Sequence, residues 1–426
     1  MSSLTSESVI VCSQSGPLSG EVTVPGAKNS VLKLMAATLL ADGVYELRNV
    51  PDITDVDYMT DLLVALGLDI ERGDRHRLRI VNLGRISPVV PFALADRIRA
   101  SVNVLGPLIG RFGDVQLALP GGDDFGGRPI DMHLSGLEAM GAQFELTDDG
   151  VLGRTSGRLK GADITFAFPS VGATENILMA AVVAEGVTTI SNAAREPEIG
   201  DLCAMLQSMG AHIDGVGTST LVIRGVSPAS MQSCVHAVVS DRVQAATYIA
   251  AVAMCGGDIE VQRAVPSHME MLLTRYADMG MSILPIEDGL RVSCHHRLSA
   301  IDVATLPYPG IATDYKPLLV AMLATSDGTG IVTENLYPGR FRYIEELRKL
   351  GADISVDGHH AVVRGRDHLV GATVVAPDIR AGAALVVAGL AAQGMTEIHD
   401  VHHIDRGYDD LVGRLANLGG SINRIG

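Results

Sequence analysis

The chain has 426 residues, of which 47% are hydrophobic and 19% are charged, a composition typical of a globular protein with two or three domains. The formal net charge of −16 argues against a nucleic-acid-binding surface, because phosphate backbones are held by clustered lysine and arginine. The five cysteines show no CxxC spacing, so we expect reduced thiols rather than disulfides or a zinc site.

The sequence also predicts a cytoplasmic protein that does not cross a membrane. Residues 1–5 lack the basic and apolar regions of a signal peptide, and no run approaches eighteen apolar residues free of charge. An acidic protein can still bind anions if its few cations are gathered at one place, so the positions of lysine and arginine matter.

A helix followed by two short strands recurs six times along the chain. Each helix ends in Leu-Gly or Met-Gly, and successive copies lie 68 to 74 residues apart. The six dipeptides are Leu66-Gly67, Met140-Gly141, Met209-Gly210, Met279-Gly280, Leu350-Gly351 and Leu418-Gly419. Glycine at this position supplies the left-handed conformation that ends a helix. A near-constant period of this length indicates one supersecondary unit copied six times.

The first unit is predicted to contain strand, helix, strand, helix, strand and strand. We expect strands at 21–24 and 44–50 around a helix that begins near Lys28, then a helix at 56–66 and strands at 68–71 and 78–81. Apolar residues of the 56–66 helix recur at spacings of three and four, which is typical of a helix with one buried face.

The other helix of each unit is rich in small apolar residues on nearly every face, which predicts burial. These helices are expected within 28–43, 97–113, 172–186, 241–257, 314–328 and 378–394, each ended by glycine. We predict that Asp241, Asp314 and Asp378 are N-terminal caps, because a carboxylate oxygen accepts hydrogen bonds from the first free N–H groups of a helix.

Two domains of three units each are predicted. Residues 226–240 lack the unit pattern and separate the first three units from the last three, and a second crossing is expected near residues 20–26. One domain would comprise residues 1–22 plus 238–426, and the other residues 23–237, including a loop at 119–130. Residues 9–13 would complete the sixth unit, because only one strand follows Leu418-Gly419.

Cations recur at the starts of the buried helices. Lys28 opens an otherwise apolar helix, and Arg97 and Arg99 repeat the arrangement in the second unit. A solvated lysine at a helix end is the alternative interpretation of Lys28. Three more arginines follow strands in other units: Arg195, Arg340 and Arg406. If the buried helices share one direction, their positive ends and these side chains form an anion site.

A glycine-rich stretch at 119–133 carries two adjacent acids, Asp123 and Asp124. It could be a surface turn, but its length is more typical of a functional lid.

Three His-His pairs also occur: His295-His296, His359-His360 and His402-His403. Adjacent residues in a strand point to opposite faces, so we predict no metal site. No GxxxxGK[ST] or strand-linked GxGxxG motif is present, and we predict no cofactor.

Six ordered motifs together resemble one enzyme family. They are Pro25-Gly-Ala-Lys-Asn-Ser30, Arg99-Ala-Ser with Leu105-Gly-Pro-Leu108, Leu119-Pro-Gly-Gly with Arg128-Pro-Ile-Asp131, Pro169-Ser-Val-Gly-Ala-Thr174, Asn192-Ala-Ala-Arg-Glu-Pro197 and Ile404-Asp-Arg-Gly-Tyr408. Across essentially the whole chain, the sequence resembles the UDP-N-acetylglucosamine enolpyruvyl transferases of the EPSP synthase-like superfamily. The resemblance implies an α/β fold of two domains, each an inside-out α/β barrel of three βαβαββ repeats.

The resemblance implies that enolpyruvate passes from phosphoenolpyruvate to the 3-hydroxyl of UDP-N-acetylglucosamine, with release of phosphate and without a metal. This is the first committed step of peptidoglycan synthesis. By motif position, phosphoenolpyruvate would be held by Lys28, Arg128, Arg380 and Arg406. The UDP-sugar site would be lined by Asn29, Arg99, Arg128, Pro129, Ile130, Asp131, Met132, Ser170, Val171, Gly172, Asp314, Leu336 and Arg340.

The same resemblance assigns two acids to proton transfer. Asp314 would accept the proton of the attacking hydroxyl, and Asp123 would protonate the methylene carbon of phosphoenolpyruvate. With Lys28 and Arg406, these acids would form the catalytic set, because acid–base steps on both sides of a tetrahedral intermediate need cations that stabilise the charge. Asp123 stands where most members of the family have a reactive cysteine, which predicts resistance to fosfomycin.

Other departures from the family pattern leave alternatives for the acceptor. Ile311-Ala312 replaces Phe-Pro, Pro338-Gly339 precedes Arg340, and Gln244 replaces an acid. One alternative is an enolpyruvyl transferase that acts on UMP or another nucleotide in secondary metabolism. A second is a non-catalytic paralogue that senses UDP-sugars, although such a protein would have lost proton-transfer groups that are present here. The enolpyruvyl-shikimate-phosphate synthases share the fold but fit Lys28-Asn29 and Arg128-Pro129 poorly.

Overall fold

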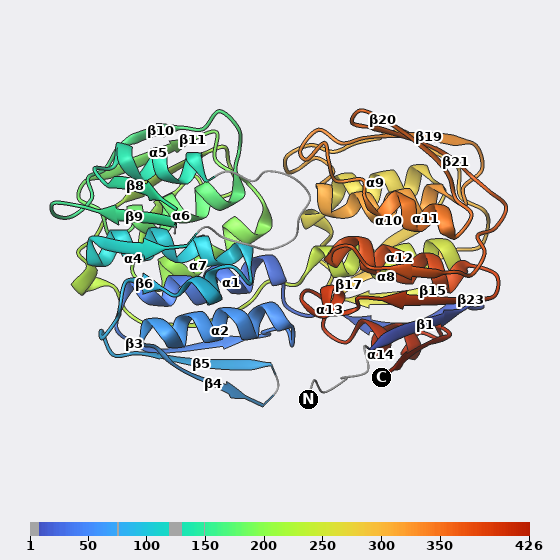
Figure 1. Ribbon diagram of the computed structural model, residues 1–426, viewed down its shortest axis with the longest axis horizontal. Helices are drawn as coiled ribbons and strands as arrows, with labels where there is room; N and C mark the ends of the chain where they lie inside the picture. Colours follow the sequence, from blue (N-terminus) through green and yellow to red (C-terminus); the bar gives the residue numbers. More distant parts are fainter. Residues whose placement is uncertain (1–7, 75, 119–129, 149) are drawn as a thin grey trace. The chain divides into compact units, whose positions relative to one another are not determined.

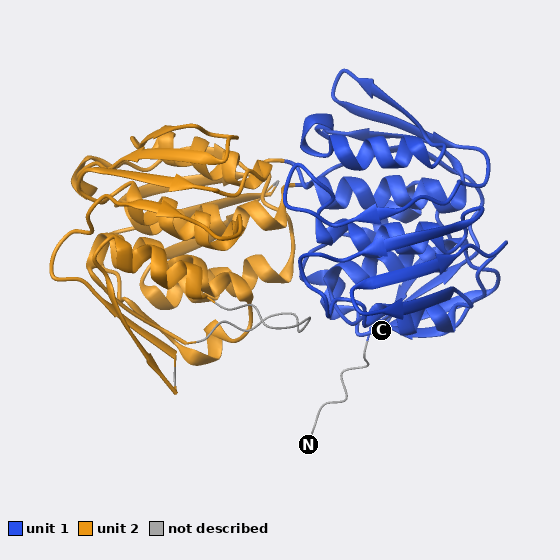
Figure 2. Ribbon diagram, turned by 90° about the horizontal axis from the view of Figure 1, so that it is seen from above, with its two compact units in different colours: residues 1–25, 124–126, 240–426 blue, residues 26–123, 127–239 orange. Residues whose placement is uncertain are grey.

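The computed structural model (Figure 1) describes residues 8–74, 76–118, 130–148 and 150–426. These residues fall into two compact units, and the chain crosses between them at Pro25–Gly26 and at Val239–Ser240 (Figure 2). Unit 1 contains residues 8–25 and 240–426, and unit 2 contains the described residues from 26 to 239. The crossings differ from the domain boundaries expected from the sequence by two or three residues.

Each unit contains three four-stranded sheets among its described residues. In unit 2 the hydrogen-bonded neighbours are β14 (Val235–Ala237), β3 (Gly43–Arg48), β5 (Arg77–Asn82) and β4 (Asp69–Gly73); β6 (Val89–Val90), β7 (Asp114–Leu117), β9 (Gly150–Arg154) and β8 (Gln143–Thr147); and β10 (Asp163–Thr165), β11 (Val187–Ser191), β13 (Thr220–Arg224) and β12 (His212–Asp214). In unit 1 they are β2 (Leu18–Thr23), β15 (Gly257–Gln262), β17 (Gly289–Cys294) and β16 (Ser282–Ile286); β18 (Val303–Ala304), β19 (Thr329–Thr333), β21 (His360–Arg364) and β20 (Asp353–Asp357); and β22 (Thr373–Val375), β23 (Met395–His399), β1 (Val9–Ser13) and β24 (Ile422–Ile425).

Every sheet follows the same plan of one parallel pair and two antiparallel pairs. The prediction of an α/β fold with six repeats, three per unit, is therefore confirmed. The prediction that residues 9–13 complete the sixth repeat is also confirmed, because β1 pairs with both β23 and β24.

The two crossings of the chain exchange one strand between repeats. The strand expected at 21–24 was predicted to open the first repeat, but β2 pairs in parallel with β15 of the fourth repeat. The first repeat receives its parallel edge strand from β14, which lies in the segment expected to lack the repeat pattern. Both predictions were wrong for one reason: hydrogen bonding across a sheet decides where an edge strand pairs, and the order of elements along the chain does not.

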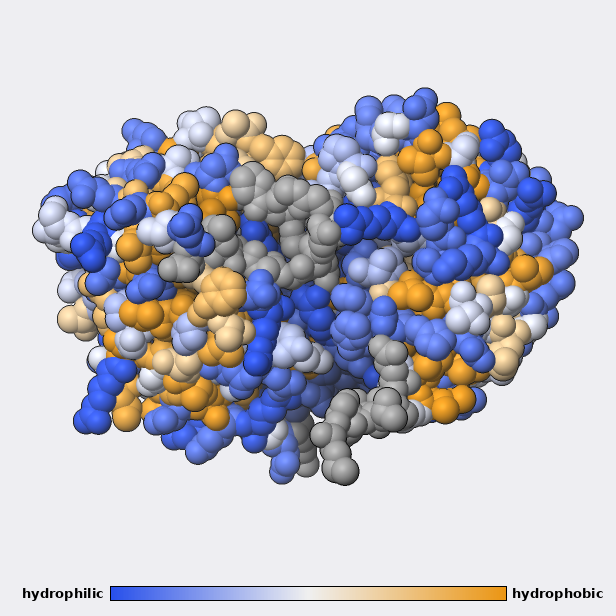
Figure 3. All heavy atoms as spheres, viewed as in Figure 1, coloured by the Kyte–Doolittle hydropathy of each residue, from blue (hydrophilic) through white to orange (hydrophobic). Residues whose placement is uncertain are grey.

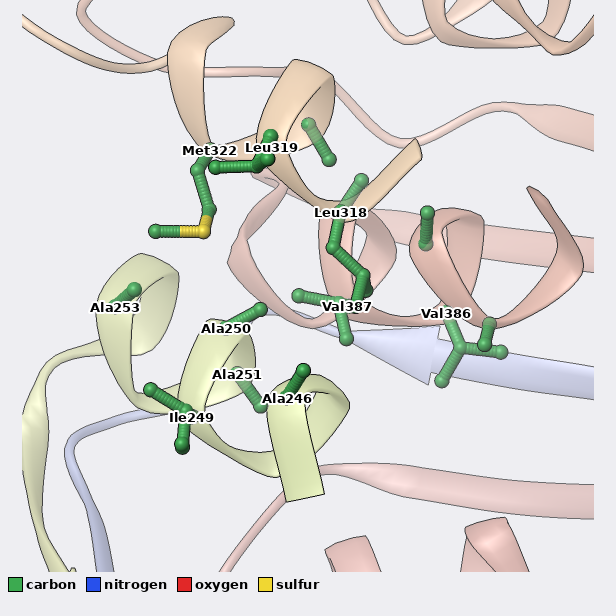
Figure 4. Close-up of a cluster of buried hydrophobic side chains, with 14 of the residues drawn as sticks. Ala246, Ile249, Ala250, Ala251, Ala253, Leu318, Leu319, Met322, Val386 and Val387 are labelled. Carbon is green, nitrogen blue, oxygen red and sulfur yellow. The ribbon is translucent and has the colours of Figure 1, made fainter. Parts of the chain in front are cut away.

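Among the described residues, each repeat has one buried helix and one second helix, and two repeats have a short helix as well. The buried helices are α1 (Lys28–Ala37), α4 (Leu105–Phe112), α6 (Val171–Ala181), α8 (Arg242–Cys255), α10 (Lys316–Leu323) and α12 (Ile379–Ala391). The second helices are α2 (Thr54–Leu66), α5 (Asp131–Ala139), α7 (Pro197–Ser208), α9 (Glu270–Asp278), α11 (Tyr343–Lys349) and α14 (Leu411–Asn417), and the short helices are α3 (Phe92–Ala95) and α13 (His402–Asp405). In unit 1, α8, α10 and α12 pack together through side chains such as Ala250, Leu318 and Val387 (Figure 4).

The ends of the helices agree only partly with the predicted caps. All six glycines of the Leu-Gly and Met-Gly pairs have φ between 87° and 113°, as predicted. Asp241 and Asp378 cap α8 and α12 through their carboxylate oxygens, also as predicted. Among the buried helices, only α4 is capped by its predicted residue, Gly113. α8 is capped by Gly256, and the other four end several residues before their glycine, which begins or directly precedes the next strand.

In the part of the chain that the structure describes, no helix combines the length and the hydrophobicity needed to cross a bilayer. Strands expose single apolar side chains on their outer faces, for example Val44, Leu146 and Met395. On the face shown in Figure 3, hydrophobic residues are interspersed with hydrophilic ones. Single exposed apolar side chains are ordinary on protein surfaces and do not by themselves indicate an interaction site.

Candidate active site

Asp314 lies in unit 1, in the 3-10 turn η5 (Thr313–Tyr315) that leads into α10. Its Oδ1 accepts a hydrogen bond from Nη1 of Arg340 at 2.9 Å, and its Oδ2 accepts one from Nε of Arg380 at 3.2 Å. Both arginine side chains are 4% exposed, whereas that of Asp314 is 24% exposed. The prediction that Asp314 caps a helix was wrong, because α10 starts after η5 and receives no side-chain cap.

The two arginines come from different repeats. Arg340 follows β19, and Arg380 is the second residue of α12, so residues far apart in the sequence meet at Asp314. Nη1 of Arg380 is buried and makes no hydrogen bond to any described residue. Leaving a guanidinium N–H buried without an acceptor is unfavourable. Two cations facing one carboxylate, with Nη1 of Arg380 still able to donate, therefore form a site suited to an anion.

Arg406 lies in the last repeat of the same unit, between α13 and α14. It directly follows α13, which packs against α12, the helix that carries Arg380. Tyr408, two residues later, places its ring 5.5 Å from the guanidinium of Arg380. The hydroxyl of Tyr408 lies 2.9 Å from Oγ1 of Thr247 in α8, which fixes the ring against a third helix. Arg406 itself is half-buried.

Lys28 lies in unit 2 as the first residue of α1. Its Nζ lies 3.0 Å from Oδ2 of Asp55 in α2, and the two side chains are 14% and 3% exposed. The lysine is thus largely buried and paired, unlike the solvated lysine of the alternative interpretation. Arg97 differs: its Nη1 lies 3.3 Å from Oδ2 of Asp61, and both side chains are about half exposed. Arg97 therefore forms a surface ion pair.

The predicted UDP-sugar residues of unit 2 lie on neighbouring elements. Ser170 caps α6, where its Oγ accepts a hydrogen bond from the N–H of Ala173 at 3.3 Å. A Cβ atom on Gly172 would come within 3.0 Å of the ring of His133, so the start of α6 lies against α5. Burial and the nearby Arg99 lower the pKa of His133 to about 4. The neutral imidazole lies 2.8 Å from the side-chain nitrogen of Asn176, which ties α5 to α6.

The remaining predicted residues take the following places. Asn29 is the second residue of α1, Arg99 opens the 3-10 turn η2 (Arg99–Val104), Asp131 and Met132 open α5, Ile130 precedes α5, Val171 opens α6, and Leu336 follows β19. α1 packs against η2, which brings Asn29 and Arg99 to adjoining elements. Asp123, Arg128 and Pro129 lie outside the described residues. Apart from these three, the predicted residues fall into two groups, one in each unit.

The sequence did not identify two buried ions in unit 1, Lys316 and Glu334, whose side chains are 0% exposed. A lysine within the apolar stretch 315–323 was the signal that could have revealed them.

Among the described residues, no group of three or more histidine, cysteine, aspartate or glutamate side chains could hold a metal ion. His402 and His403 lie in the helix α13, so the argument from strand geometry does not apply to that pair.

Known proteins match the chain over nearly its whole length. The family model described as EPSP synthase (3-phosphoshikimate 1-carboxyvinyltransferase) matches residues 12–415. The UDP-N-acetylglucosamine 1-carboxyvinyltransferase of Mycobacterium leprae (strain TN) is 51% identical over 409 residues, which cover 96% of this chain and 97% of the relative. The enzyme with the same name from Corynebacterium jeikeium (strain K411) is 48% identical over 408 residues, with the same coverage of both chains.

Two solved structures have a similar fold. The crystal structure of the enolpyruvyl transferase NikO from Streptomyces tendae matches with a TM-score of 0.88 and 25% identity, covering 98% of this chain and 99% of the other. An EPSP synthase from Acinetobacter baumannii matches with a TM-score of 0.74 and 16% identity, covering 99% of this chain and 100% of the other. The second match shows the fold alone.

Proposed function

Because the chain belongs to the EPSP synthase family of carboxyvinyltransferases, we propose that it transfers enolpyruvate from phosphoenolpyruvate to the 3-hydroxyl of UDP-N-acetylglucosamine and releases phosphate. Identity near 50% over 96% of the chain to enzymes named for this acceptor supports the choice of UDP-N-acetylglucosamine. The product commits the sugar nucleotide to peptidoglycan synthesis. A cytoplasmic location, as expected from the sequence, suits two phosphorylated metabolites.

The contact set around Asp314 is the observation that carries the proposed chemistry. A partly exposed carboxylate held between two buried guanidinium groups has a defined orientation and one side open to a ligand. Such a group can accept the proton of an attacking hydroxyl while the arginines stabilise negative charge nearby. We assign Asp314 this role, with Leu336 and Arg340 beside the sugar nucleotide.

The reaction then proceeds by addition and elimination. The oxygen of the 3-hydroxyl bonds to C2 of phosphoenolpyruvate as its proton passes to Asp314, and Asp123 gives a proton to the methylene carbon C3. The product of this step is a tetrahedral ketal that carries both phosphate and sugar. Loss of a proton from C3 and cleavage of the bond from C2 to the phosphate oxygen restore the double bond. The chain supplies acid–base groups and cations for each step.

Cations from both groups of residues are proposed to bind phosphoenolpyruvate. Lys28, Arg380 and Arg406 are assigned to its phosphate and carboxylate, together with Arg128. The burial of most of the Lys28 side chain and of nearly all of the Arg380 side chain supports this role, because a charge-assisted hydrogen bond is stronger where water is excluded. Asn29, Arg99, Pro129 to Met132 and Ser170 to Gly172 are assigned to the UDP-sugar, where the N-terminus of α6 favours an anion.

Phosphate release measured with separate acceptors tests the proposal. The protein is incubated with phosphoenolpyruvate and one of three acceptors: UDP-N-acetylglucosamine, UMP or shikimate 3-phosphate. Release only with UDP-N-acetylglucosamine is the expected result. Release with UMP alone would favour the nucleotide-acceptor alternative. If no acceptor supports release but UDP-N-acetylglucosamine still binds in calorimetry, the chain is a sensing paralogue and the enzymatic proposal fails.

A further inference from the structure

The buried ion pair Lys316–Glu334 is not part of the chemistry described above. Nζ of Lys316, the first residue of α10, lies 2.8 Å from Oε2 of Glu334, which follows β19. The same Nζ donates a hydrogen bond to the backbone carbonyl of Arg340 and lies 4.0 Å from the centre of the Phe341 ring. Both charged side chains are 0% exposed, so the pair is fully removed from water.

Glu334 accepts hydrogen bonds at both of its carboxylate oxygens. Oε1 accepts from the backbone N–H groups of Leu336 at 2.8 Å and Tyr337 at 3.1 Å, and from the hydroxyl of Thr305 at 2.7 Å. Oε2 accepts from the hydroxyl of Thr313 at 2.7 Å. One buried carboxylate therefore fixes the start of segment 334–340, and Lys316 fixes its end through the carbonyl of Arg340.

Glu334 contacts residues on both sides of Asp314 in the sequence. Thr313, which precedes Asp314, donates to Glu334 and accepts a hydrogen bond at 3.1 Å from Nη1 of Arg340. Lys316, two residues after Asp314, contacts Glu334 directly. A change in the pair would consequently displace Asp314, Leu336 and Arg340 together, and all three belong to the proposed sugar-nucleotide side of the site.

Burying two charges is costly, and an apolar pair of similar volume often gives equal or greater stability. The extra hydrogen bonds connect the pair to the backbone of Leu336, Tyr337 and Arg340, and to the side-chain hydroxyl of Thr313, which precedes Asp314. We propose that Lys316 and Glu334 are positioning residues that hold Asp314 and segment 334–340 in the geometry that binds the UDP-sugar acceptor. This inference rests on the proposed function and names no new reacting group.

Three variants test the proposal: Lys316→Met, Glu334→Gln and the double variant that combines them. Each single variant is expected to raise the Kd and KM for UDP-N-acetylglucosamine about tenfold or more, because small displacements of binding groups are costly. The KM for phosphoenolpyruvate should change by less than a factor of about three, since Lys28 and Arg406, which are assigned to that substrate, are unaltered in these variants. Lys349→Met is the matched control, because it removes an exposed lysine paired with Glu346 at 2.7 Å on α11.

A double-mutant cycle separates positioning from stability. Each single variant leaves one buried charge without its partner, so the double variant should bind the UDP-sugar better than either single variant. Thermal unfolding is measured alongside calorimetric binding of UDP-N-acetylglucosamine. Coupling in the unfolding midpoint without coupling in the Kd would overturn the proposal, as would equal weakening of both substrates. Wild-type phosphate release with UDP-N-acetylglucosamine is measured first, and its absence would count against the proposed function instead.

Discussion

Oδ1 of Asp314 lies 2.9 Å from Nη1 of Arg340, although the two residues belong to different elements and Arg340 is almost fully buried. Because the guanidinium group is packed inside the protein, its position is fixed, and its hydrogen bond holds the carboxylate in one orientation. Arg380 does the same at the other oxygen. A base that must meet one hydroxyl of a large substrate benefits from such restraint.

The first prediction concerns Asp314. Asp314→Asn should lower kcat by roughly two to four orders of magnitude, because the amide cannot accept the hydroxyl proton. Binding of UDP-N-acetylglucosamine should remain measurable by calorimetry. Asp278→Asn is the control, since Asp278 forms an exposed pair with Arg275 at 3.0 Å. Turnover within a factor of about three of the wild type would remove Asp314 from the proton-transfer step.

The second prediction concerns the cations assigned to phosphoenolpyruvate. Lys28→Ala and Arg406→Ala should each lower turnover by two to three orders of magnitude, since each removes a charge-assisted contact of roughly 2–4 kcal/mol. Lys28→Ala also leaves Asp55 buried without this partner, so unfolding must be measured in parallel. Lys160→Ala, at an exposed ion pair with Glu185, should leave turnover unchanged. Normal turnover of either site variant at saturating substrate would contradict the assignment.

The third prediction concerns Asp123, which lies outside the described residues. A carboxylate is a far weaker nucleophile toward an epoxide than a thiolate, so fosfomycin should form no covalent adduct with the protein. Asp123→Cys should remain active and become sensitive to fosfomycin, whereas Asp123→Ala should be nearly inactive. Intact-protein mass spectrometry after incubation with the drug measures the adduct. A stoichiometric adduct on the unaltered protein would refute the interpretation, and full activity of the alanine variant would exclude Asp123 from catalysis.

The fourth prediction concerns Glu175 in α6, which is fully buried within unit 2. Burial raises the pKa of Glu175 to about 7, while Lys33, 3.4 Å away, lowers it and Glu198 and Glu196 raise it. The folded state thus binds a proton that the unfolded state has released above pH 4.5. This group's contribution to stability is present below pH 4.5 and is lost as the pH rises through about 7.

The corresponding measurement is the free energy of unfolding against pH. Between pH 4.5 and pH 7, Glu175 should lower the free energy of unfolding of the wild type by up to about 3 kcal/mol. Glu175→Gln should flatten that part of the curve, because the amide does not titrate. Glu185→Gln, at an exposed glutamate, serves as the control. Parallel curves for the wild type and Glu175→Gln would show that Glu175 does not titrate in this range.

The six-repeat architecture could be predicted from the sequence because its signals are local. Gly67 and its five counterparts adopt the left-handed conformation that glycine accepts without steric cost. Apolar spacing marked the buried faces of the helices, and the carboxylates of Asp241 and Asp378 accept hydrogen bonds from backbone N–H groups two and three residues later. Each of these features depends on residues a few positions apart, so the sequence alone contains the information.

Only the tertiary structure decided which distant residues meet. β2 pairs with β15 and β14 pairs with β3 although these strands are far apart in the sequence, and no local pattern specifies such partners. Asp314 was expected to cap a helix, but its carboxylate binds Arg340, which follows β19 of the same repeat, and Arg380 from α12 of the next repeat. Lys316 and Glu334 can be buried only because each neutralises the other across the fold, and that compensation depends on three-dimensional proximity.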